Sequence, residues 1–440
     1  MKIAIIGGGF TGLTAAYELT KRGHEVSLFE KDKTLGGLAH GFKLPNWNWS
    51  LEKAYHHLFT NDDVILSLIK ELSLSDKLII KRPITANYWD GQIYPFDSPQ
   101  NLLSFPGLPM IDKLRTAVFL AALKVTPFWQ PLESVTAEQL FVSIGGKRAW
   151  ETIWRSLMIG KFGDYADSVA ASWLWARIKK RTPNLCYIEG GFQTLVDRLS
   201  KAIRDHEGTI YTNTSISSME KGARGQYYVL WEKQKQRFDR ILLTIPTPIA
   251  LKLIPNWKLE IGNWKLLSIP HLHAQTLILE TLEPLLKGVY WLNILDRSFP
   301  FLAVVAHTNF MDPKHYGGHY LTYFGNYLPE GHPYLSLTAE QLLKKFLPYI
   351  NKLTSINSEF RIQSSESMKK KSKFIILNTK LFVGLFAQPI HELHYSQKIP
   401  PISTPIPGIY LANMDYIYPW DRGTNYAVEL GLRAAQALLR

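Results

Sequence analysis

The sequence predicts an α/β fold in which a parallel-sheet domain is interleaved with an α+β domain made of an antiparallel sheet and helices. The chain opens on a strand–turn–helix–strand pattern, and the same alternation returns twice further along. The segments between carry helical patterns and short apolar runs separated by loops. The 440 residues are enough to build two such cores. We therefore assign residues 1–50, 186–250 and 374–440 to the first domain, and residues 51–185 and 251–373 to the second.

The amino-acid composition is that of a folded globular protein. Hydrophobic residues make up 46% of the chain and charged residues 20%, which is typical of a globular protein. The formal net charge of +13 suits an anionic ligand or a membrane surface, or serves only solubility. No apolar run reaches the ~17 residues needed to span a bilayer. We expect a cytoplasmic protein whose only membrane association is peripheral, with a small-molecule substrate and no nucleic-acid partner.

The single cysteine, Cys186, excludes an intrachain disulfide and a metal site built from several cysteines. We expect it to be a small buried apolar residue. No cluster of His, Cys and carboxylates has metal-ligand spacing, so we expect no metal.

The first element is a strand followed by a glycine turn. The apolar run from Ile3 to Ile6 is typical of a central parallel strand. Gly7, Gly9 and Gly12 follow with G-x-G-x-x-G spacing. The first glycine permits a tight turn, the second lets a pyrophosphate approach the backbone, and the third lets helix and strand pack closely.

A helix over residues 10–22 and a strand over residues 25–30 complete the unit. The strand ends on Glu30, 18 positions after Gly12, where a carboxylate can accept hydrogen bonds from ribose hydroxyls. The motif stands in its full strand–turn–helix–strand context, which predicts a Rossmann-like dinucleotide-binding domain. We expect Phe10, Thr11 and Lys31 to lie beside the dinucleotide.

The continuation "EKDKTLGGLAHGF", with Gly36 and Gly37, resembles the N-terminal signature of the flavin amine oxidase superfamily. That group includes protoporphyrinogen oxidases, phytoene desaturases and UDP-galactopyranose mutases. The resemblance implies that FAD is the cofactor, that Glu30 binds its adenosine ribose, and that the second glycine pair runs past the flavin. Leu38 is a further candidate for contact with the cofactor, and it stands where many members carry Arg, which argues against the amine-oxidising branch.

The stretch "YHHLFTND" is similar to a segment of UDP-galactopyranose mutases whose histidine lies against the flavin. Either His56 or His57 matches that histidine. The alternative is that the two imidazoles only cap a loop. A helix is predicted to begin at residues 62–63, and "NYWDGQIYPF" predicts a hairpin with an Asp90-Gly91 turn.

Residues 98–181 are predicted to be mostly helical. Within them, residues 110–125 are apolar with basic residues at one end. We expect a core helix there, and the alternative is a membrane-facing helix. Four cations that follow are interpreted mainly as surface charges, with an anion-facing role as the alternative: Lys147, Arg148, Arg155 and Lys161.

The first return to the first domain begins near residue 186. A strand is predicted over residues 209–219, and a further strand runs into Pro246. By resemblance to the superfamily, Ile216 is placed at the adenine and Thr244 beside the cofactor. Residues 255–373 alternate short apolar strands with loops and a helix at 338–350, which resembles the sheet that lies over the flavin ring. The lysine run at 369–373 is predicted to be a solvated loop.

The C-terminal stretch "NMDYIYPWDRGTNYAVELG" predicts the start of a last helix. The residues Gly423, Thr424 and Asn425 are placed at the flavin, where a helix N-terminus stabilises negative charge. Because this motif has no cysteine, we expect non-covalent FAD. Asn413 is a further cofactor candidate, and Tyr418, Trp420 and Arg422 are catalytic or cavity-lining candidates together with His56 and His57. The alternative for Arg422 is that it only pairs with Asp421.

Two functions follow from the resemblance. The first is an FAD-dependent oxidoreductase of the oxidase, dehydrogenase or desaturase type, in which an organic substrate transfers a hydride to flavin N5. The second is a non-redox flavoenzyme similar to UDP-galactopyranose mutase that acts on a nucleotide sugar. No pair of tyrosines and arginines clearly matches the diphosphate site of the mutases, so the first is preferred.

Overall fold

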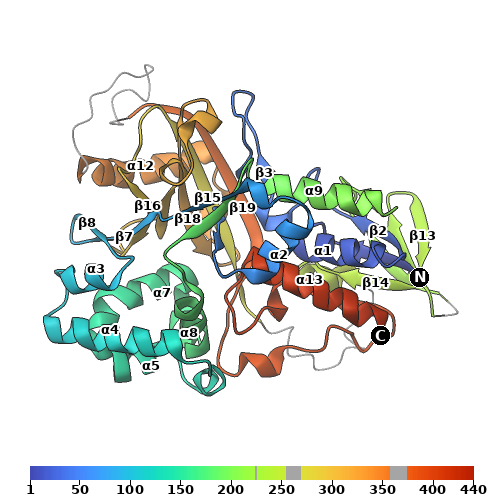
Figure 1. Ribbon diagram of the computed structural model, residues 1–440, viewed down its shortest axis with the longest axis horizontal. Helices are drawn as coiled ribbons and strands as arrows, with labels where there is room; N and C mark the ends of the chain where they lie inside the picture. The colour runs from blue at the N-terminus through green and yellow to red at the C-terminus, as the bar shows by residue number, and fades with distance from the viewer. Residues whose placement is uncertain (223–224, 254–268, 357–373) are drawn as a thin grey trace.

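The structure is a computed structural model of the chain, and it describes residues 1–222, 225–253, 269–356 and 374–440. The lysine run at 369–373 lies outside the described residues. Figure 1 shows three regions: a parallel sheet with long helices on the right, a large sheet with one helix at the upper left, and a helical layer at the lower left. Both termini lie at the outer end of the first region.

The first region is built on a five-stranded parallel sheet. Its strands, in spatial order, are β10 (Thr209–Tyr211), β2 (Glu25–Phe29), β1 (Lys2–Ile6), β14 (Arg240–Leu243) and β20 (Ile409–Leu411). The apolar strand β1 is central, with β2 on one side and β14 on the other, and its last four residues are buried. The strand order therefore reverses at the carboxyl end of β1, which is where open α/β sheets bind ligands.

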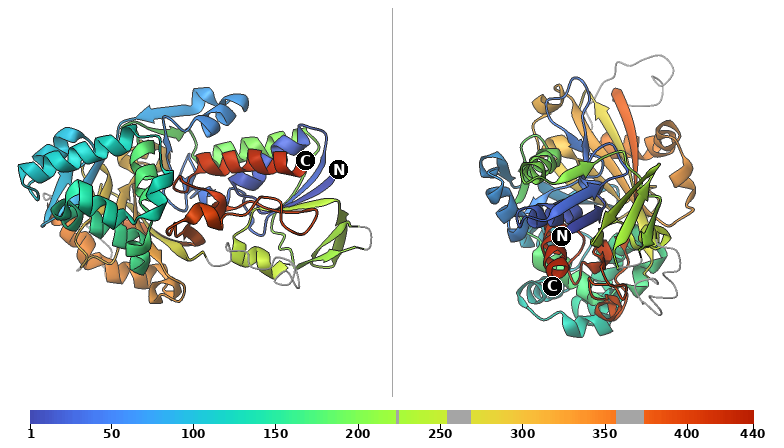
Figure 2. Two further views of the ribbon diagram at one scale, coloured as in Figure 1. Left: turned by 90° about the horizontal axis from the view of Figure 1, so that it is seen from below. Right: turned by 90° about the vertical axis from the view of Figure 1, so that its right-hand side faces the viewer.

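Four helices and a small meander flank this sheet. They are α1 (Phe10–Thr20), α2 (Asp63–Glu71), α9 (Phe192–Asp205), α13 (Thr424–Leu439), β11 (Ser218–Lys221), β12 (Tyr227–Trp231) and β13 (Gln234–Phe238). The two terminal helices, α1 and α13, pack on each other (Figure 2). A Cβ on Gly431 of α13 would lie 2.6 Å from the carbonyl oxygen of Thr11, so the glycine is needed for this close approach.

The strand predicted over residues 209–219 is wrong, because the chain breaks into β10 and β11. Asn213 takes a left-handed conformation with φ 53°, and its N–H donates to the carbonyl of Asp32 at 2.9 Å. The N–H of Thr214 donates to the carbonyl of Glu30 at 2.8 Å. The loop thus crosses the end of β2 instead of continuing as a strand.

The second region is a seven-stranded sheet covered by α12 (Ala339–Ile356). In spatial order its strands are β19 (Ile376–Pro389), β15 (His271–Thr281), β18 (Tyr320–Leu328), β17 (Ala303–Ala306), β16 (Val289–Ile294), β7 (Ile84–Trp89) and β8 (Gln92–Pro95). The Asp90-Gly91 hairpin is confirmed, since both residues have positive φ. Strand pairing places β19 in this sheet, although residues 374–440 were assigned to the first domain.

The third region confirms the helical prediction for residues 98–181. Its helices are α3 (Pro99–Ser104), α4 (Met110–Val125), α5 (Ala137–Leu140), α6 (Lys147–Ala149), α7 (Arg155–Phe162) and α8 (Ala171–Lys180). The prediction of a core helix over 110–125 is wrong in one respect: α4 buries only Lys113, Thr116, Phe119 and Leu123, and its other face is open. No helix in the described ranges is both long and apolar enough to cross a membrane.

Short elements join the regions. They are β3 (Gly41–Phe42), β4 (Leu51–Glu52), β5 (Leu58–Phe59), β6 (Leu78–Lys81), β9 (Leu185–Ile188) and α10 (Thr247–Leu253). Cys186 lies buried and unpaired in β9, as predicted.

Candidate functional site

Two glycine turns meet at the carboxyl end of β1. The N–H of Gly36 donates to the carbonyl of Gly8 at 2.8 Å, which holds the second turn against the first. A Cβ on Gly37 would lie 3.0 Å from the Cα of Gly9. The two turns therefore form one continuous backbone surface without side chains between them.

The first turn needs its glycines for different reasons. Gly7 has φ +117°, which L side chains rarely adopt, and a Cβ on Gly12 would lie 2.0 Å from the carbonyl oxygen of Gly7. The hydroxyl of Thr244 at the end of β14 bonds to that same carbonyl at 2.9 Å. Thr244 is thus a positioning residue that braces the turn.

Glu30 lies over the first turn. One carboxylate oxygen accepts the N–H of Gly8 at 2.7 Å and the other accepts the N–H of Asp32 at 2.9 Å. The side chain is 8% exposed. Ile216 lies in the loop that crosses the end of β2 and is also nearly buried, whereas Lys31 is exposed. The structure thus brings Glu30 to the glycine turn as the sequence predicts.

The residues present fit a dinucleotide. Helix α1 begins at Gly9, which offers no side-chain cap, so the first backbone N–H groups point out of the helix. A Cβ on Gly9 would meet only the Cα of Gly37, at 3.8 Å, so the space above the turn is open to a ligand. Uncapped N–H groups and the helix dipole favour a pyrophosphate there. Phe10 and Thr11 form the buried first turn of α1.

The last helix has a comparable start. Gly423 is the N-cap of α13 and offers no side-chain cap. Thr424 and Asn425 are buried, and the side-chain oxygen of Asn425 accepts the N–H of Ile65 at 3.0 Å, which ties α13 to α2. The backbone N–H groups of this first turn are therefore available to a ligand, while the Asn425 side chain is engaged with the protein.

Asn413 has its side chain fully used within the protein. Its amide donates to the carbonyl of Ile245 and to the hydroxyl of Thr247, both at 2.9 Å, and its oxygen accepts the N–H of Asp415 at 3.1 Å. We infer that Asn413 positions the segment before α13 through these bonds.

Arg422 reaches the seven-stranded sheet. Its Nε donates to Gln388 of β19 at 2.9 Å, and another guanidinium nitrogen bonds to the hydroxyl of Tyr327 of β18. The carboxylate of Asp421 instead contacts Lys161 at 2.6 Å and Arg177 at 3.7 Å. The alternative in which Arg422 and Asp421 form only a mutual ion pair is therefore wrong, because their side chains point to different partners.

Tyr418 and Trp420 are packed against other rings. The hydroxyl of Tyr418 lies 2.7 Å from that of Ser172, and its ring stacks on Tyr395 with centroids 5.1 Å apart. Trp420 stacks between Trp175 and Tyr426, at 5.2 and 5.6 Å. Both rings remain partly exposed, so each offers one edge to its surroundings.

The two adjacent histidines face different partners. Nδ1 of His56 donates to the carbonyl of Ala54 at 2.7 Å, which leaves Nε2 as the unprotonated nitrogen. Nδ1 of His57 lies 3.2 Å from the hydroxyl of Tyr290 in the seven-stranded sheet. Burial, opposed by the hydrogen bond to Ala54 and assisted by the charges of Arg422 and His40, lowers the pKa of His56 to about 4, and burial lowers the pKa of His57 to about 3. Both rings are therefore neutral near pH 7.

Tyr55, which precedes these histidines, was not among the residues that the sequence predicts for the site, whereas Leu38 was a predicted cofactor contact. Tyr55 stands edge-on to Trp291 with centroids 4.9 Å apart. A Cβ on Gly325 of β18 would lie 2.6 Å from the Tyr55 hydroxyl, so that strand needs a glycine there. Leu38, which follows the second glycine pair, packs on Gly384 of β19, where a Cβ would lie 2.7 Å from its methyl group. The adjacency of Tyr55 to His56 was the one available signal.

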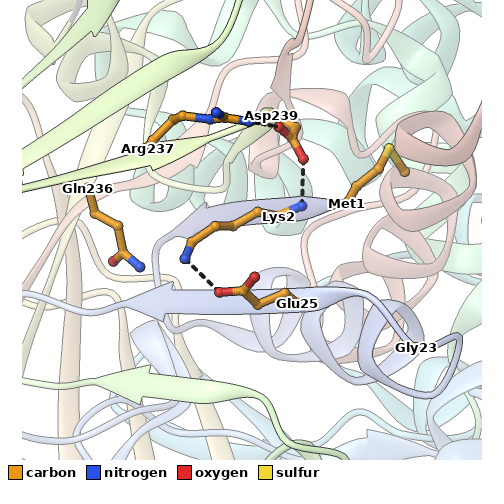
Figure 3. Close-up of a pocket in the computed structure, with 7 residues that line it drawn as sticks. All are labelled: Met1, Lys2, Gly23, Glu25, Gln236, Arg237 and Asp239. Carbon is orange, nitrogen blue, oxygen red and sulfur yellow. Dashed lines mark hydrogen bonds and ion pairs between the residues drawn. The ribbon is translucent and has the colours of Figure 1, made fainter.

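A separate depression lies at the opposite end of the parallel sheet. It has a volume of about 550 Å³ and is lined by polar residues that include Lys2, Glu25 and Asp239 (Figure 3). Lys2 pairs with Glu25 at 2.6 Å across its floor. It lies at the amino ends of the strands, away from the glycine turns. Across the described part of the chain, no group of three or more His, Cys, Asp and Glu could hold a metal ion.

Comparison with known proteins agrees with this geometry. Residues 10–439 match the family model described as flavin containing amine oxidoreductase. Zeta-carotene desaturase from Solanum lycopersicum is 25% identical over 412 residues, which cover 78% of this chain and 67% of the desaturase. The match to the Capsicum annuum desaturase spans 54% of that protein's length.

Two solved structures share the fold. An oxidoreductase from Methanosarcina mazei has a TM-score of 0.73 at 18% identity, covering 99% of this chain and 100% of that one. Reduced UDP-galactopyranose mutase has a TM-score of 0.72 at 15% identity, covering 100% and 95%. At these identities the likeness establishes the interleaved α/β fold alone. Because the family model covers nearly the whole chain, the protein is an FAD-dependent oxidoreductase that belongs to the flavin-containing amine oxidoreductase family.

Proposed function

We propose that the protein binds FAD non-covalently between the two glycine turns and the start of α13, and that it oxidises a small organic substrate. The observation that carries this proposal is the pairing of two uncapped helix starts, Gly9 of α1 and Gly423 of α13, on helices that pack on each other. The first suits the pyrophosphate and the second suits the flavin.

The chemistry that FAD supplies is acceptance of a hydride at N5, which leaves negative charge on the N1 side of the ring. The residues of this chain then have distinct roles. Glu30 would hold the ribose, the N–H groups at the start of α13 would donate to the flavin ring, and Arg422 would add a positive charge nearby. His56 is the histidine that we place at the flavin, because His57 is turned to the hydroxyl of Tyr290 in the seven-stranded sheet, whereas Nε2 of His56 is left free to accept a hydrogen bond.

The alternative, a non-redox enzyme acting on a nucleotide sugar, is not favoured by the family match. An anaerobic experiment separates the two. Oxidised holoenzyme is mixed with candidate polyenes, amines or tetrapyrroles, and reduced holoenzyme with UDP-galactose. Bleaching of the flavin coupled to substrate oxidation is expected. Isomerisation of the sugar by reduced enzyme, without net change in the flavin, would contradict the proposal.

A cytoplasmic location also stays a proposal. It is tested by fractionation of cells that express the protein. Recovery in the cytosol or on the cytoplasmic face of a membrane is expected, and recovery from another compartment would contradict it.

A further inference from the structure

Four cationic side chains gather where the helical region meets the seven-stranded sheet. They come from three separate segments: the end of α7, the end of α8 with the residue after it, and the residue before the N-cap of α13. We call them the cationic cluster: Lys161, Arg177, Arg181 and Arg422.

The cationic cluster contains more cations than there are carboxylates beside it. Asp421 contacts both Lys161, at 2.6 Å, and Arg177, at 3.7 Å. Within the described residues, neither Arg181 nor Arg422 has a carboxylate within 4 Å. Asp421 pairs with two of the four cations, and the charge of Asp97 acts on Arg181 from beyond 4 Å, so four cations stand against two carboxylates.

Shared aromatic rings show that these charges occupy one place. Lys161 and Arg177 both lie over the Trp173 ring, at 4.9 and 5.7 Å from its centroid. Lys161 and Arg422 both lie over Tyr327, at 5.8 and 4.8 Å. Arg181 follows Arg177 by four residues, so the two lie on the same side at the end of α8.

The cluster is enclosed by protein yet keeps accessible surface. Burial lowers the pKa of Lys161 to about 7 and that of Arg422 to about 10. Even so, Arg422 and Lys161 are only partly buried and Arg181 is exposed. Gathering unpaired cations in such surroundings opposes folding, which is typical of a binding site rather than of a structural ion pair.

We propose that the cationic cluster binds an anionic group of the substrate, either a carboxylate or a phosphate. This inference rests on the proposed function, since it concerns the substrate of the same site. The planar guanidinium groups of Arg177, Arg181 and Arg422 suit two-pronged contacts with such oxyanions. A substrate made only of hydrocarbon offers nothing to neutralise them.

Isothermal titration calorimetry on the FAD-loaded enzyme tests the proposal. The probes are inorganic pyrophosphate in one arm and succinate in the other, which distinguishes a phosphate site from a carboxylate site. Arg181→Gln is the main variant, because among the described residues the Arg181 side chain makes just one hydrogen bond, a long one of 3.5 Å to the Thr85 hydroxyl. Arg148→Gln is the matched control, since Arg148 is an exposed arginine on the short helix α6.

At least one anion is expected to bind the wild type, and Arg181→Gln is expected to weaken that binding by about tenfold to a hundredfold, as for a lost charged hydrogen bond. The Arg148→Gln control should bind as the wild type does. Equal affinity in wild type and Arg181→Gln, or no binding of either anion, would overturn the inference. FAD content is measured on the same samples, so an absence of FAD counts against the proposed function alone.

The exposed face of α4 supports a second inference, which rests on a different observation. Apolar side chains recur there with helical spacing and are largely exposed: Ile111 is 76%, Leu114 52%, Val118 70% and Val125 75% accessible. Met110, the first residue of the helix, is 56% accessible. A continuous apolar stripe of this kind marks an interaction surface.

Basic residues border this stripe. Lys147 and Arg148 are exposed on α6, which packs on α4. Arg115 and Lys124 lie on α4 itself, where they also donate to backbone carbonyls of residues 143–144 and of the end of α8. An apolar stripe edged by positive charge is complementary to an anionic lipid bilayer, because the apolar side chains enter the interface while the cations meet the headgroups. We propose that α4 docks the protein on an anionic membrane surface.

Vesicle co-sedimentation tests this inference on the full-length holoenzyme. Vesicles of phosphatidylcholine alone are compared with mixtures that contain phosphatidylglycerol. Wild type is expected to sediment with the anionic vesicles, and the double variant Ile111→Ser/Val118→Ser to stay in the supernatant. The control pair Leu282→Ser/Leu385→Ser removes exposed apolar side chains outside α4 and should behave as wild type.

Two results would overturn the membrane inference. One is failure of the wild type to bind anionic vesicles. The other is a wild-type oligomer, seen by light scattering, that the Ile111→Ser/Val118→Ser variant dissociates without any vesicle binding, since α4 would then meet a second copy of the chain.

Discussion

Gly37 lies directly against Gly9, and the contact is asymmetric. A Cβ on Gly37 would come within 3.0 Å of the Cα of Gly9 in a backbone with φ +58°, so the chain itself opposes a side chain there. A Cβ on Gly9 would meet nothing closer than 3.8 Å, and Gly9 has an ordinary φ of −76°. A substitution at Gly9 can therefore interfere with a bound ligand without disturbing the fold.

Gly9→Asp is expected to abolish retention of FAD while the chain still folds. The new carboxylate would stand where the pyrophosphate binds and would repel it. FAD content after purification and the circular dichroism spectrum measure the two effects. Gly9→Ala is the control for the added Cβ, and full FAD retention by Gly9→Asp would show that this turn does not hold the pyrophosphate.

Gly431→Ala is expected to lower the free energy of unfolding by about 1–3 kcal/mol, because its Cβ would meet the backbone of α1. The helices must move apart, so FAD affinity should fall as well. Urea unfolding measures the first effect and FAD titration the second. Gln436→Ala, on the exposed side of α13, should change neither. Unchanged stability of Gly431→Ala would mean that the two helices do not pack this closely.

Glu52 predicts a pH dependence of stability. Its carboxylate is fully buried and accepts the Tyr187 hydroxyl and the Phe192 N–H, each at 2.7 Å. Burial raises the pKa of Glu52 from its ordinary value of 4.5 to about 7. Between these values the unfolded chain releases the proton and the folded chain retains it, so rising pH favours unfolding.

Glu52→Gln should remove this contribution. Relative to the variant, the wild type is expected to lose roughly 2–3 kcal/mol of unfolding free energy between about pH 4.5 and about pH 7. Urea unfolding at a series of pH values measures the difference between the two proteins. The control is Glu189→Gln, an exposed carboxylate. If the difference in unfolding free energy between wild type and Glu52→Gln does not vary with pH, the pKa of Glu52 is not raised by folding.

Lys161 predicts a pH dependence of anion binding. Burial lowers its pKa to about 7, Asp421 opposes the shift, and Arg177 and Arg422 add to it. Lys161 therefore loses its positive charge as pH rises through about 7. A bound anion favours the charged form, so in the complex the charge is lost at a higher pH. Affinity for sulfate, whose own charge stays constant, should fall between about pH 6 and about pH 9. Lys161→Gln should bind sulfate weakly at every pH, and a Lys161→Gln profile as steep as that of wild type would contradict this role.

The two glycine turns and the place of Glu30 beside them were predictable because their determinants are local. Gly7, Gly9 and Gly12 set one turn, and Glu30 ends the adjacent strand, so neighbouring residues specify the geometry. The strand over 209–219 failed for a local reason too. Asn213 takes the left-handed conformation that asparagine tolerates. The spacing of apolar residues carries no information about this turn, so the strand was predicted to continue.

The surroundings of Arg422 and Lys161 were less predictable because their contacts are long-range. Arg422 meets Tyr327 and Gln388, which lie 95 and 34 residues away along the chain. Of the four cations interpreted mainly as surface charges, Lys161 alone reaches the cationic cluster, since it pairs with Asp421, 260 residues away. Its companions Lys147, Arg148 and Arg155 are exposed, as that interpretation predicts.

The content of FAD in the purified protein tests the central claim most directly. Purified or FAD-reconstituted protein is precipitated with acid, and flavin is measured in the supernatant and in the pellet. Equimolar FAD in the supernatant is the predicted result, because the two glycine turns and the start of α13 hold it without a covalent bond. Flavin that stays with the pellet, or no flavin bound even after reconstitution, would contradict the account.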